Sequence, residues 1–302
     1  LMNALKVIIY FSIFKYPLTK EEVFSFSSDN SIEDTELQLK KLIENNIVYK
    51  FGNYYSDIND ETLVERRLSG NKMANDIMPK ALKRAKLIMF FPYVESVSIS
   101  GALAKGYHDN DGDIDFFIIT KPKHLWLART LLVAYKKLFL LNSKKYFCVN
   151  YFISSDRLKI AEQNKFTATE LVTLIPIYGK TVFNEFVAEN SWALDFYPNK
   201  TINTKLLSEG FKKPFWSNSL EVLFNNKLGY NLNNYFKKVT LRKWKSKFKH
   251  LKEKDFEIAM KSTNDVSKHH PQDFQSKVIV SLNERYDDKN KAFNLNLTME
   301  NA

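Results

Sequence analysis

Two aspartates, Asp113 and Asp115, are separated by one residue and lead directly into the apolar run Phe116–Ile119. In a β-strand, residues i and i+2 point to the same face, so both carboxylates are expected to project together from one edge of a sheet. Neighbouring carboxylates repel each other unless a cation lies between them, and a divalent ion with oxygen ligands, Mg²⁺, suits that position. The pair therefore predicts a magnesium site.

A turn that suits phosphate binding precedes these aspartates. Val97 and Ile99 indicate a strand that ends at Ser100-Gly101, and a polar, glycine-containing loop connects it to the next strand. Glycine lets backbone N–H groups approach a phosphate closely. Carboxylates, a metal ion and a phosphate cradle together are typical of phosphoryl or nucleotidyl transfer, whereas a solvated turn or a calcium loop is the simpler alternative.

The stretch 97–120 resembles the signature of the polymerase-beta-like nucleotidyltransferases, a Gly-Ser pair followed by Asp-x-Asp on the next strand. Gly101-Ala102 stands at the Gly-Ser position, Ala104-Lys105-Gly106 matches the small-basic-Gly element, and Asp113-Ile114-Asp115 matches the Asp-x-Asp. The resemblance is looser over 90–180. It implies that Asp113 and Asp115 bind Mg²⁺ as catalytic residues, and that Ser100, Gly101 and Lys105 lie near the phosphates of a nucleoside triphosphate.

The sequence departs from the family pattern at two positions. Ala102 replaces the serine that usually contacts nucleotide phosphates, and Ser100 is a candidate substitute. The third strand, predicted over Phe147–Ile153, is where the family usually places a third carboxylate, and the polar residue here is Asn150. An amide oxygen can bind Mg²⁺ but cannot act as a general base. Either two carboxylates suffice for catalysis, or the site binds nucleotide without turnover.

Composition bounds the other function classes. The chain has 302 residues and 44% hydrophobic residues, enough for two or three compact units with real cores. The single cysteine, Cys148, excludes a disulfide framework and predicts a reducing, cytoplasmic location. No apolar run is long enough for a membrane span. A net charge of +11 suggests that the protein binds nucleic acid, and the distribution of the charges along the chain can test this hypothesis.

Residues 1–58 are predicted to form a winged helix, with three helices and a hairpin over 47–55. Thr19 and Glu22 form a predicted capping box at the second helix. Winged helices commonly bind DNA through their third helix. Residues 1–56 carry six Lys against seven Asp or Glu, so their charge opposes DNA binding. Docking onto the catalytic domain or onto a protein partner is expected instead.

Residues 59–92 are predicted as linker helices, broken at Gly70 and Pro79. Residues 93–180 are the predicted catalytic core: two strands, an amphipathic helix over 124–141, and the third strand. His124 at the start of that helix is expected to be structural. A further helix is expected from Thr167 to about Tyr178, opened by a capping box that accounts for Glu170. The resemblance also makes Glu170 a candidate site residue.

Residues 181–270 are predicted to form a helical basic region. Residues 200–253 contain thirteen Lys or Arg residues and only three Glu residues. Phe236–Lys252 is predicted to be an amphipathic helix with a cationic outer face. That face is either a solvated surface or a binding surface for an anionic acceptor such as RNA, a sugar phosphate or a polyanionic polymer. His269-His270 is expected to lack metal-ligand geometry. Residues 271–302 are predicted to be a C-terminal tail, of which 284–302 are expected to be loosely held.

The fold class expected is therefore α/β (α+β): a small mixed-sheet nucleotidyltransferase core with an N-terminal winged-helix unit and a helical C-terminal region. The expected function is Mg²⁺-dependent transfer of a nucleoside monophosphate from a nucleoside triphosphate to a hydroxyl or phosphate acceptor. A degenerate nucleotide-binding scaffold or sensor is the alternative, and a DNA-binding regulator is a third hypothesis. The sequence does not select the nucleotide or the acceptor.

Overall fold

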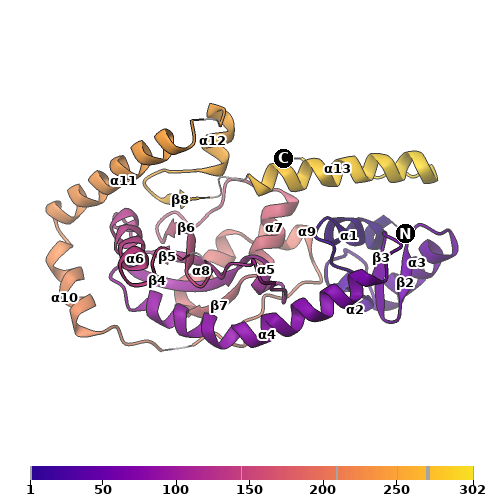
Figure 1. The fold of residues 1–302 in the computed structure, drawn as a ribbon, viewed down its shortest axis with the longest axis horizontal. Helices are drawn as coiled ribbons and strands as arrows, with labels where there is room; N and C mark the ends of the chain where they lie inside the picture. Colours follow the sequence, from indigo (N-terminus) through magenta and orange to yellow (C-terminus); the bar gives the residue numbers. More distant parts are fainter. Residues whose placement is uncertain (1, 144, 209, 250, 270–272, 302) are drawn as a thin grey trace.

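A computed structural model describes residues 2–143, 145–208, 210–249, 251–269 and 273–301. The protein is of mixed α/β class, as expected, with a five-stranded mixed sheet and a separate three-stranded antiparallel sheet. Figure 1 shows the five-stranded sheet in the middle of an elongated molecule, with the N-terminal helices at one end and α10 (Phe215–Phe224) at the other. Within the described residues, no helix combines the length and the apolar character that crossing a bilayer requires.

The central sheet has the strand order β7-β4-β5-β6-β8. Its strands are β4 (Val94–Ser100), β5 (Asp115–Thr120), β6 (Cys148–Ser154), β7 (Ile175–Tyr178) and β8 (Val266–Lys268). Strands β5 and β6 are parallel, and α6 (Leu125–Phe139) forms the crossover between them, whereas the other pairs are antiparallel. A parallel pair requires such a crossover because the last residue of one strand and the first residue of the next lie at opposite ends of the pair.

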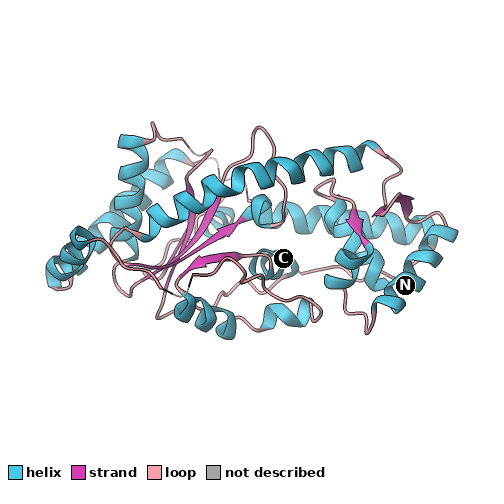
Figure 2. Cartoon of the chain, turned by 90° about the horizontal axis from the view of Figure 1, so that it is seen from below, coloured by secondary structure: helices cyan, strands magenta, loops and turns pink. Residues whose placement is uncertain are grey.

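Strand β5 is buried on both faces, which explains its uninterrupted apolar sequence. Phe116 and Ile118 belong to a hydrophobic cluster on one face, with side chains from α6, α4 (Thr62–Met89) and α11 (Lys227–Lys247). Phe117 and Ile119 belong to a second cluster on the other face. Figure 2 shows helices on both sides of the sheet. Because β5 is central and doubly covered, the carboxylate at its first residue, Asp115, occupies a fixed position.

The remaining helices span a wide range of lengths. They are α1 (Met2–Ser12), α2 (Lys20–Ser25), α3 (Ile32–Glu44), α4 (Thr62–Met89), α5 (Gly101–Ala104), α7 (Lys165–Val172), α8 (Lys180–Glu189), α9 (Trp192–Phe196), α10 (Phe215–Phe224), α11 (Lys227–Lys247), α12 (Glu253–Ala259) and α13 (Phe274–Phe293). The strands of the small sheet are β1 (Leu18–Thr19), β2 (Tyr49–Phe51) and β3 (Tyr54–Ser56).

The N-terminal unit contains the expected three helices and hairpin. The capping box at Thr19 is confirmed, because its hydroxyl accepts a hydrogen bond from Glu22 N while the Glu22 carboxylate accepts one from Thr19 N. Strands β2 and β3 pair around Gly52, whose φ of +59° is a conformation that glycine adopts readily. Local sequence signals thus account for this unit.

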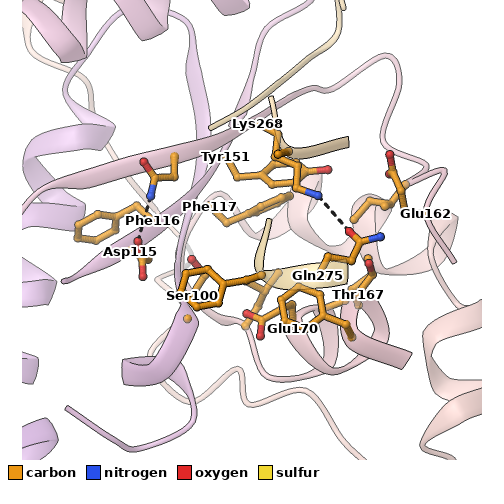
Figure 3. Close-up of a pocket in the computed structure, with 18 of the residues that line it drawn as sticks. Ser100, Asp115, Phe116, Phe117, Tyr151, Glu162, Thr167, Glu170, Lys268 and Gln275 are labelled. Carbon is orange, nitrogen blue, oxygen red and sulfur yellow. Dashed lines mark hydrogen bonds between the residues drawn. The ribbon is translucent and has the colours of Figure 1, made fainter. Parts of the chain in front are cut away.

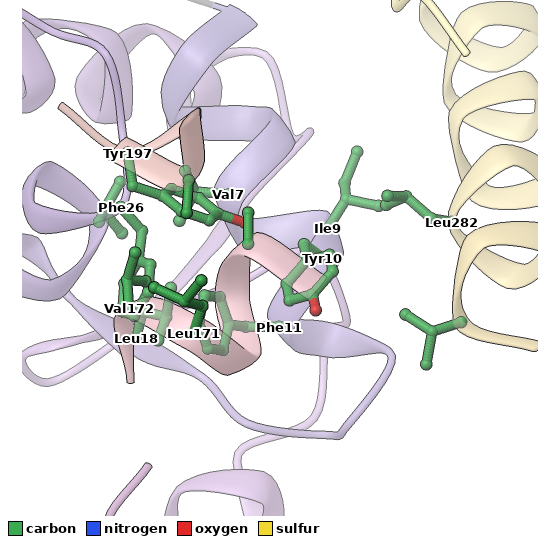
Figure 4. Close-up of a cluster of buried hydrophobic side chains, with 14 of the residues drawn as sticks. Val7, Ile9, Tyr10, Phe11, Leu18, Phe26, Leu171, Val172, Tyr197 and Leu282 are labelled. Carbon is green, nitrogen blue, oxygen red and sulfur yellow. The ribbon is translucent and has the colours of Figure 1, made fainter. Parts of the chain in front are cut away.

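The N-terminal unit packs on the rest of the protein through a continuous hydrophobic cluster. Figure 4 shows α1 between two other parts of the chain, with Phe11 beside Leu171 and Val172 of α7, and Ile9 facing Leu282 of α13. The rings of Phe26 and Tyr197 also meet edge to face, 5.4 Å apart. The expected docking onto the core is therefore observed as shared hydrophobic burial.

Helix α4 is continuous, so the predicted break at Gly70 and Pro79 is wrong. A proline inside a helix removes one backbone hydrogen bond and costs about 3 kcal/mol. Burial of Ala74 and Ala81, on either side of the proline, offsets that cost. Gly70 is also helical, and its missing side chain leaves room for the Tyr107 ring, which crosses α4 at this point.

The helix predicted from Thr167 to Tyr178 is also wrong in extent and in its cap. Helix α7 ends at Val172, and Pro176 lies in β7, since a proline cannot continue a helix. The capping side chain is Asn164, whose Oδ1 accepts a hydrogen bond from Thr167 N at 3.0 Å. Glu170 does not form the expected box, because its carboxylate is paired with Lys105.

The expectation of a loosely held C-terminal tail is wrong. Helix α13 extends to Phe293, and Val278, Leu282 and Tyr286 bury one side of it. Beyond the helix, Leu297 is 3% exposed, and the Glu300 carboxylate lies 3.0 Å from the buried Lys165 ammonium. The regularly spaced apolar side chains of α13 hold this segment in place by burial. The ion pair between Glu300 and the buried Lys165 ammonium also holds it.

The loop between α5 and β5, which carries Asp113, is fixed against α4. The Tyr107 ring lies directly over Gly70, where an added Cβ would stand 2.1 Å from Tyr107 Cε2. The His108 N–H donates a hydrogen bond to Gly70 O at 3.1 Å, and the Arg66 guanidinium lies 4.7 Å from the Tyr107 ring centroid. Helix α4 therefore positions the loop as well as the strand.

We expect Gly70→Ala to destabilise the protein by about 1–3 kcal/mol, because the new methyl group overlaps the Tyr107 ring. Without that overlap, alanine would stabilise the helix by up to about 1 kcal/mol. Urea unfolding measures the change. Gly210→Ala, where nothing lies within 4 Å of an added Cβ, is the control and should be nearly neutral. Equal stability of the two variants would contradict the proposed contact.

Candidate functional site

The glycine turn and the aspartate strand are adjacent in the sheet. Ser100 at the end of β4 pairs with Asp115 at the start of β5. The next residue, Gly101, has a φ of +69°, and a Cβ at this position would stand 2.6 Å from Asp115 Oδ2. Gly101 is thus required both by its left-handed backbone and by the close approach of a carboxylate. The pairing brings the predicted phosphate turn and the predicted metal ligand together.

The Asp115 carboxyl group is in an electrostatically unfavourable position. Burial raises its pKa to about 7, and the negative charges of Asp113 and Glu170 add to this rise, while the Cys148 thiol and the Lys105 ammonium oppose it. An ionised Asp115 is therefore destabilised by desolvation and by two like charges. A cation among these carboxylates would reverse the effect.

Asn150 lies where the sequence analysis places it, beside the aspartates. Its amide nitrogen donates hydrogen bonds to Asp115 Oδ1 at 3.4 Å and to Cys148 Sγ at 2.9 Å. Figure 3 shows the first of these contacts. The two ends of an amide have the same shape, so rotation about its terminal bond would present the oxygen to a cation in place of the N–H groups. Asn150 can therefore support either an ionised Asp115 or a metal ion.

Lys105 lies close to the glycine turn but is engaged by another residue. Its ammonium group lies 2.6 Å from Glu170 Oε1 and donates a hydrogen bond to Gly101 O at 3.1 Å. Both side chains are partly exposed, so the ion pair remains accessible to solvent. A phosphate bound at the turn would compete with Glu170 for the Lys105 ammonium. The structure thus places Glu170, already a candidate from the sequence, beside the glycine turn.

A cavity extends from this group of residues along one face of the sheet (Figure 3). Ser100, Gly101, Asp115, Asn150 and Glu170 line one end, and Lys268 and Gln275 line the other. Aromatic side chains line the space between them, among them Phe117, Tyr151, Phe166 and Phe274. The cavity measures about 130 Å³, whereas small-molecule sites commonly measure about 300 Å³ or more, so it can enclose part of a larger ligand.

The sequence analysis missed the far end of this cavity. Lys268 belongs to β8, a strand of three residues that pairs with β6. Gln275 is the second residue of α13, which begins shortly after a segment outside the described residues. Neither residue lies in a motif. The detectable signal was the aromatic content of the third strand, where Tyr151 and Phe152 adjoin Asn150.

The oxygen atoms at this site suit a Mg²⁺ ion that is bound together with the phosphates of a nucleotide. Across the described part of the chain, no group of three or more His, Cys, Asp or Glu side chains is placed to hold a metal ion. Mg²⁺ is usually bound by one or two carboxylates together with substrate phosphates and water. Asp113, Asp115 and the Asn150 amide match that pattern and do not form a complete protein cage.

Two histidine predictions are treated differently by the structure. His124 is a structural residue, since its ring stacks on Tyr93 at 4.1 Å and its two nitrogens contact the carbonyl oxygens of Pro122 and Phe224. His269 packs against the Trp244 ring at 4.9 Å. His270 lies outside the described residues, so the interpretation of the pair stays a prediction.

Comparison of the chain with protein-family models, with curated proteins and with solved structures found no match.

We expect the change in unfolding free energy caused by Asp115→Asn to depend on pH in the protein without nucleotide or Mg²⁺. The substitution should be more stabilising at pH 8 than at pH 4, by about 1–3 kcal/mol. The folded pKa of about 7 lies above the usual value of 3.8. The protonated carboxyl therefore contributes stability that is fully present below pH 4 and is lost as the pH rises through 7. Asparagine cannot ionise and avoids this loss.

Urea unfolding at several pH values between 4 and 8 measures the effect. Asp111→Asn, an exposed carboxylate in the same loop, is the control and should show no comparable pH dependence. A constant difference between the Asp115 variant and the parent protein across this range would show that burial does not destabilise the ionised group.

Proposed function

We propose that the protein is a Mg²⁺-dependent nucleotidyltransferase that moves a nucleoside monophosphate from a nucleoside triphosphate to a hydroxyl or phosphate acceptor. The observation that carries this proposal is the approach of Gly101 to Asp115, with 2.6 Å between an added Cβ and the carboxylate. A turn without a side chain directly beside clustered carboxylates leaves room for phosphate and gives a divalent ion its ligands.

Each residue of the site has a role in this proposal. Asp113 and Asp115 bind the ion, Gly101 leaves room for the phosphates, and Ser100 and Lys105 provide hydrogen-bond donors near them. Bound Mg²⁺ would supply positive charge to the phosphate oxygens. Since Asn150 cannot accept a proton from the acceptor hydroxyl, the residues contribute mainly by positioning the reactants in line.

The order of elements supports the same proposal. Strands β4 and β5, helix α6 and strand β6 follow one another as expected for a small nucleotidyltransferase core, with the acidic residue at the first position of the central strand. We further interpret the N-terminal helices and hairpin as a winged helix that serves to dock on this core. Its acidic third helix opposes a DNA-binding role.

The second candidate function is a degenerate nucleotide-binding scaffold or sensor. Ala102 lacks a hydroxyl group for phosphate, Asn150 presents N–H groups to Asp115, and Glu170 already occupies the Lys105 ammonium. These three features favour binding without turnover. The winged-helix unit would then transmit the bound state through its shared hydrophobic cluster with α7 and α13.

We expect isothermal titration calorimetry to show nucleoside triphosphate binding that requires Mg²⁺. Asp113→Asn combined with Asp115→Asn should weaken binding by about tenfold or more, because two charged ligands are lost. Asp111→Asn is the matched control in the same loop and should bind as the parent protein does. An affinity that changes neither with Mg²⁺ nor with the double substitution would refute the proposal. Nucleotide binding without release of pyrophosphate would favour the scaffold hypothesis.

We also propose that the face formed by α11 and α6, which lies across the sheet from the cavity, binds the body of a polyanionic acceptor such as RNA. The Arg129 guanidinium is buried against the Trp244 ring at 4.6 Å, and burial lowers its pKa to about 10. The positive charge of Lys243 lowers the pKa of Lys137 on the neighbouring helix. Cations held this close together attract an anion. Arg242, Lys245 and Lys247 on α11 are also exposed.

We expect Lys137→Gln combined with Lys243→Gln to elute from a heparin column at lower salt than the parent protein, since two adjacent cations are removed. Lys40→Gln combined with Lys41→Gln removes the same charge from the exposed side of α3 and is the matched control. The first variant should shift much more than the second. Equal shifts would mean that net charge alone governs the binding of polyanions.

A further inference from the structure

The cavity beside Asp115 is built on one row of side chains across the sheet. Phe117 on β5 pairs with Tyr151 on β6, and Tyr151 pairs with Lys268 on β8. Asp115 precedes Phe117 by two residues and shares its face. Two strand spacings and one pleat repeat place Lys268 about 12 Å from Asp115 along the backbone. A nucleoside monophosphate spans such a length.

The middle of this row suits a flat ring. The Phe117 and Tyr151 rings lie 5.2 Å apart, and Phe166 of α7 and Phe274 of α13 also line the cavity. Aromatic side chains bind nucleobases by stacking, a contact worth about 1–3 kcal/mol per base. The cavity volume of about 130 Å³ has room for one ring system and leaves the triphosphate outside, beside Asp115.

The far end of the cavity holds a buried cation. Lys268 is 8% exposed, and its ammonium donates a hydrogen bond to Gln275 Oε1 at 3.0 Å (Figure 3). An ammonium has three N–H donors, and a neutral amide accepts only one of them here. The nearby Glu162 carboxylate is engaged by Lys261 at 2.8 Å. Lys268 therefore has donors available for an oxygen acceptor in the cavity.

These groups complement one class of nucleobase. Guanine, hypoxanthine and uracil carry a keto oxygen next to a ring N–H, whereas adenine and cytosine carry an amino group at the same position. The Lys268 ammonium can donate to the keto oxygen, and Gln275 Oε1 or the Asp273 carboxylate, which also lines the cavity, can accept from the ring N–H. An amino group at that place would meet the ammonium donor to donor.

We propose that this cavity is the nucleobase subsite and that Lys268 and Gln275 select nucleoside triphosphates whose base carries a keto group. The proposal rests on the proposed function, because it takes the triphosphate to lie at Asp113 and Asp115. It adds the identity of the substrate: GTP or UTP in preference to ATP or CTP. Lys268 and Gln275 are the specificity-determining residues.

The sharpest test compares inosine triphosphate with ATP, which differ only in the keto or amino group and the adjacent ring nitrogen. With Mg²⁺ present, calorimetry on the full chain should show the inosine nucleotide binding about tenfold or more tighter than ATP. Lys268→Met, which keeps the aliphatic stem, should reduce this ratio to about threefold or less. Lys277→Met removes a charge from the exposed side of α13 and should preserve the ratio.

A second variant keeps the test decisive if Lys268→Met does not fold. Lys268→Gln can still hydrogen-bond to Gln275, and its amide can present either an oxygen or an N–H to the base, so it should also reduce the preference to about threefold or less while leaving thermal unfolding near that of the parent protein. Equal affinities of the parent for both nucleotides, or a preference unchanged in both variants, would overturn the proposal.

The outcomes separate this inference from the proposed function. In one outcome the parent protein binds nucleotides with Mg²⁺ but without base preference, and the Asp113 and Asp115 double variant loses this binding. The base subsite is then wrong and the proposed function stands. If no nucleotide binds at all, the proposed function fails and the subsite with it.

Discussion

The antiparallel pairing of β4 with β5 is the contact on which the rest of the site depends. It places Ser100 opposite Asp115 and forces the chain to turn at Gly101 with a positive φ beside a carboxylate. That geometry is maintained by burial of β5 on both faces and by α4, which supports β4 and the loop carrying Asp113. The strained part of the site is small, and a large rigid scaffold surrounds it.

The arrangement leaves negative charge without full compensation. Burial and two neighbouring carboxylates raise the pKa of Asp115 to about 7, and the nearby Lys105 ammonium is shared with Glu170. A folded protein keeps such an arrangement when a ligand or metal ion relieves it. The cation and phosphate ligand proposed for this site would relieve that charge.

The sequence predicted the parts of the structure that local signals determine. Thr19 and Glu22 define their own helix start, the aspartates precede an obvious buried strand, and the apolar period of α6 is clear. Pro176 could have ended the helix that was wrongly extended to Tyr178. By contrast, no local signal places Lys268 beside Tyr151, because β8 is short and depends on a partner strand distant in sequence.

Helix α13 illustrates why the cavity could not be inferred from the sequence. Its polar composition indicated a loose tail, but Gln275 at its start lines the cavity, and Leu282 further along packs on α1. One rigid helix thus touches both the candidate base subsite and the N-terminal unit. An enzyme would use this contact to hold the wall of its subsite, and a sensor would use it to transmit occupancy. The two functional hypotheses therefore share one structural element and differ in whether bonds are broken at Asp115.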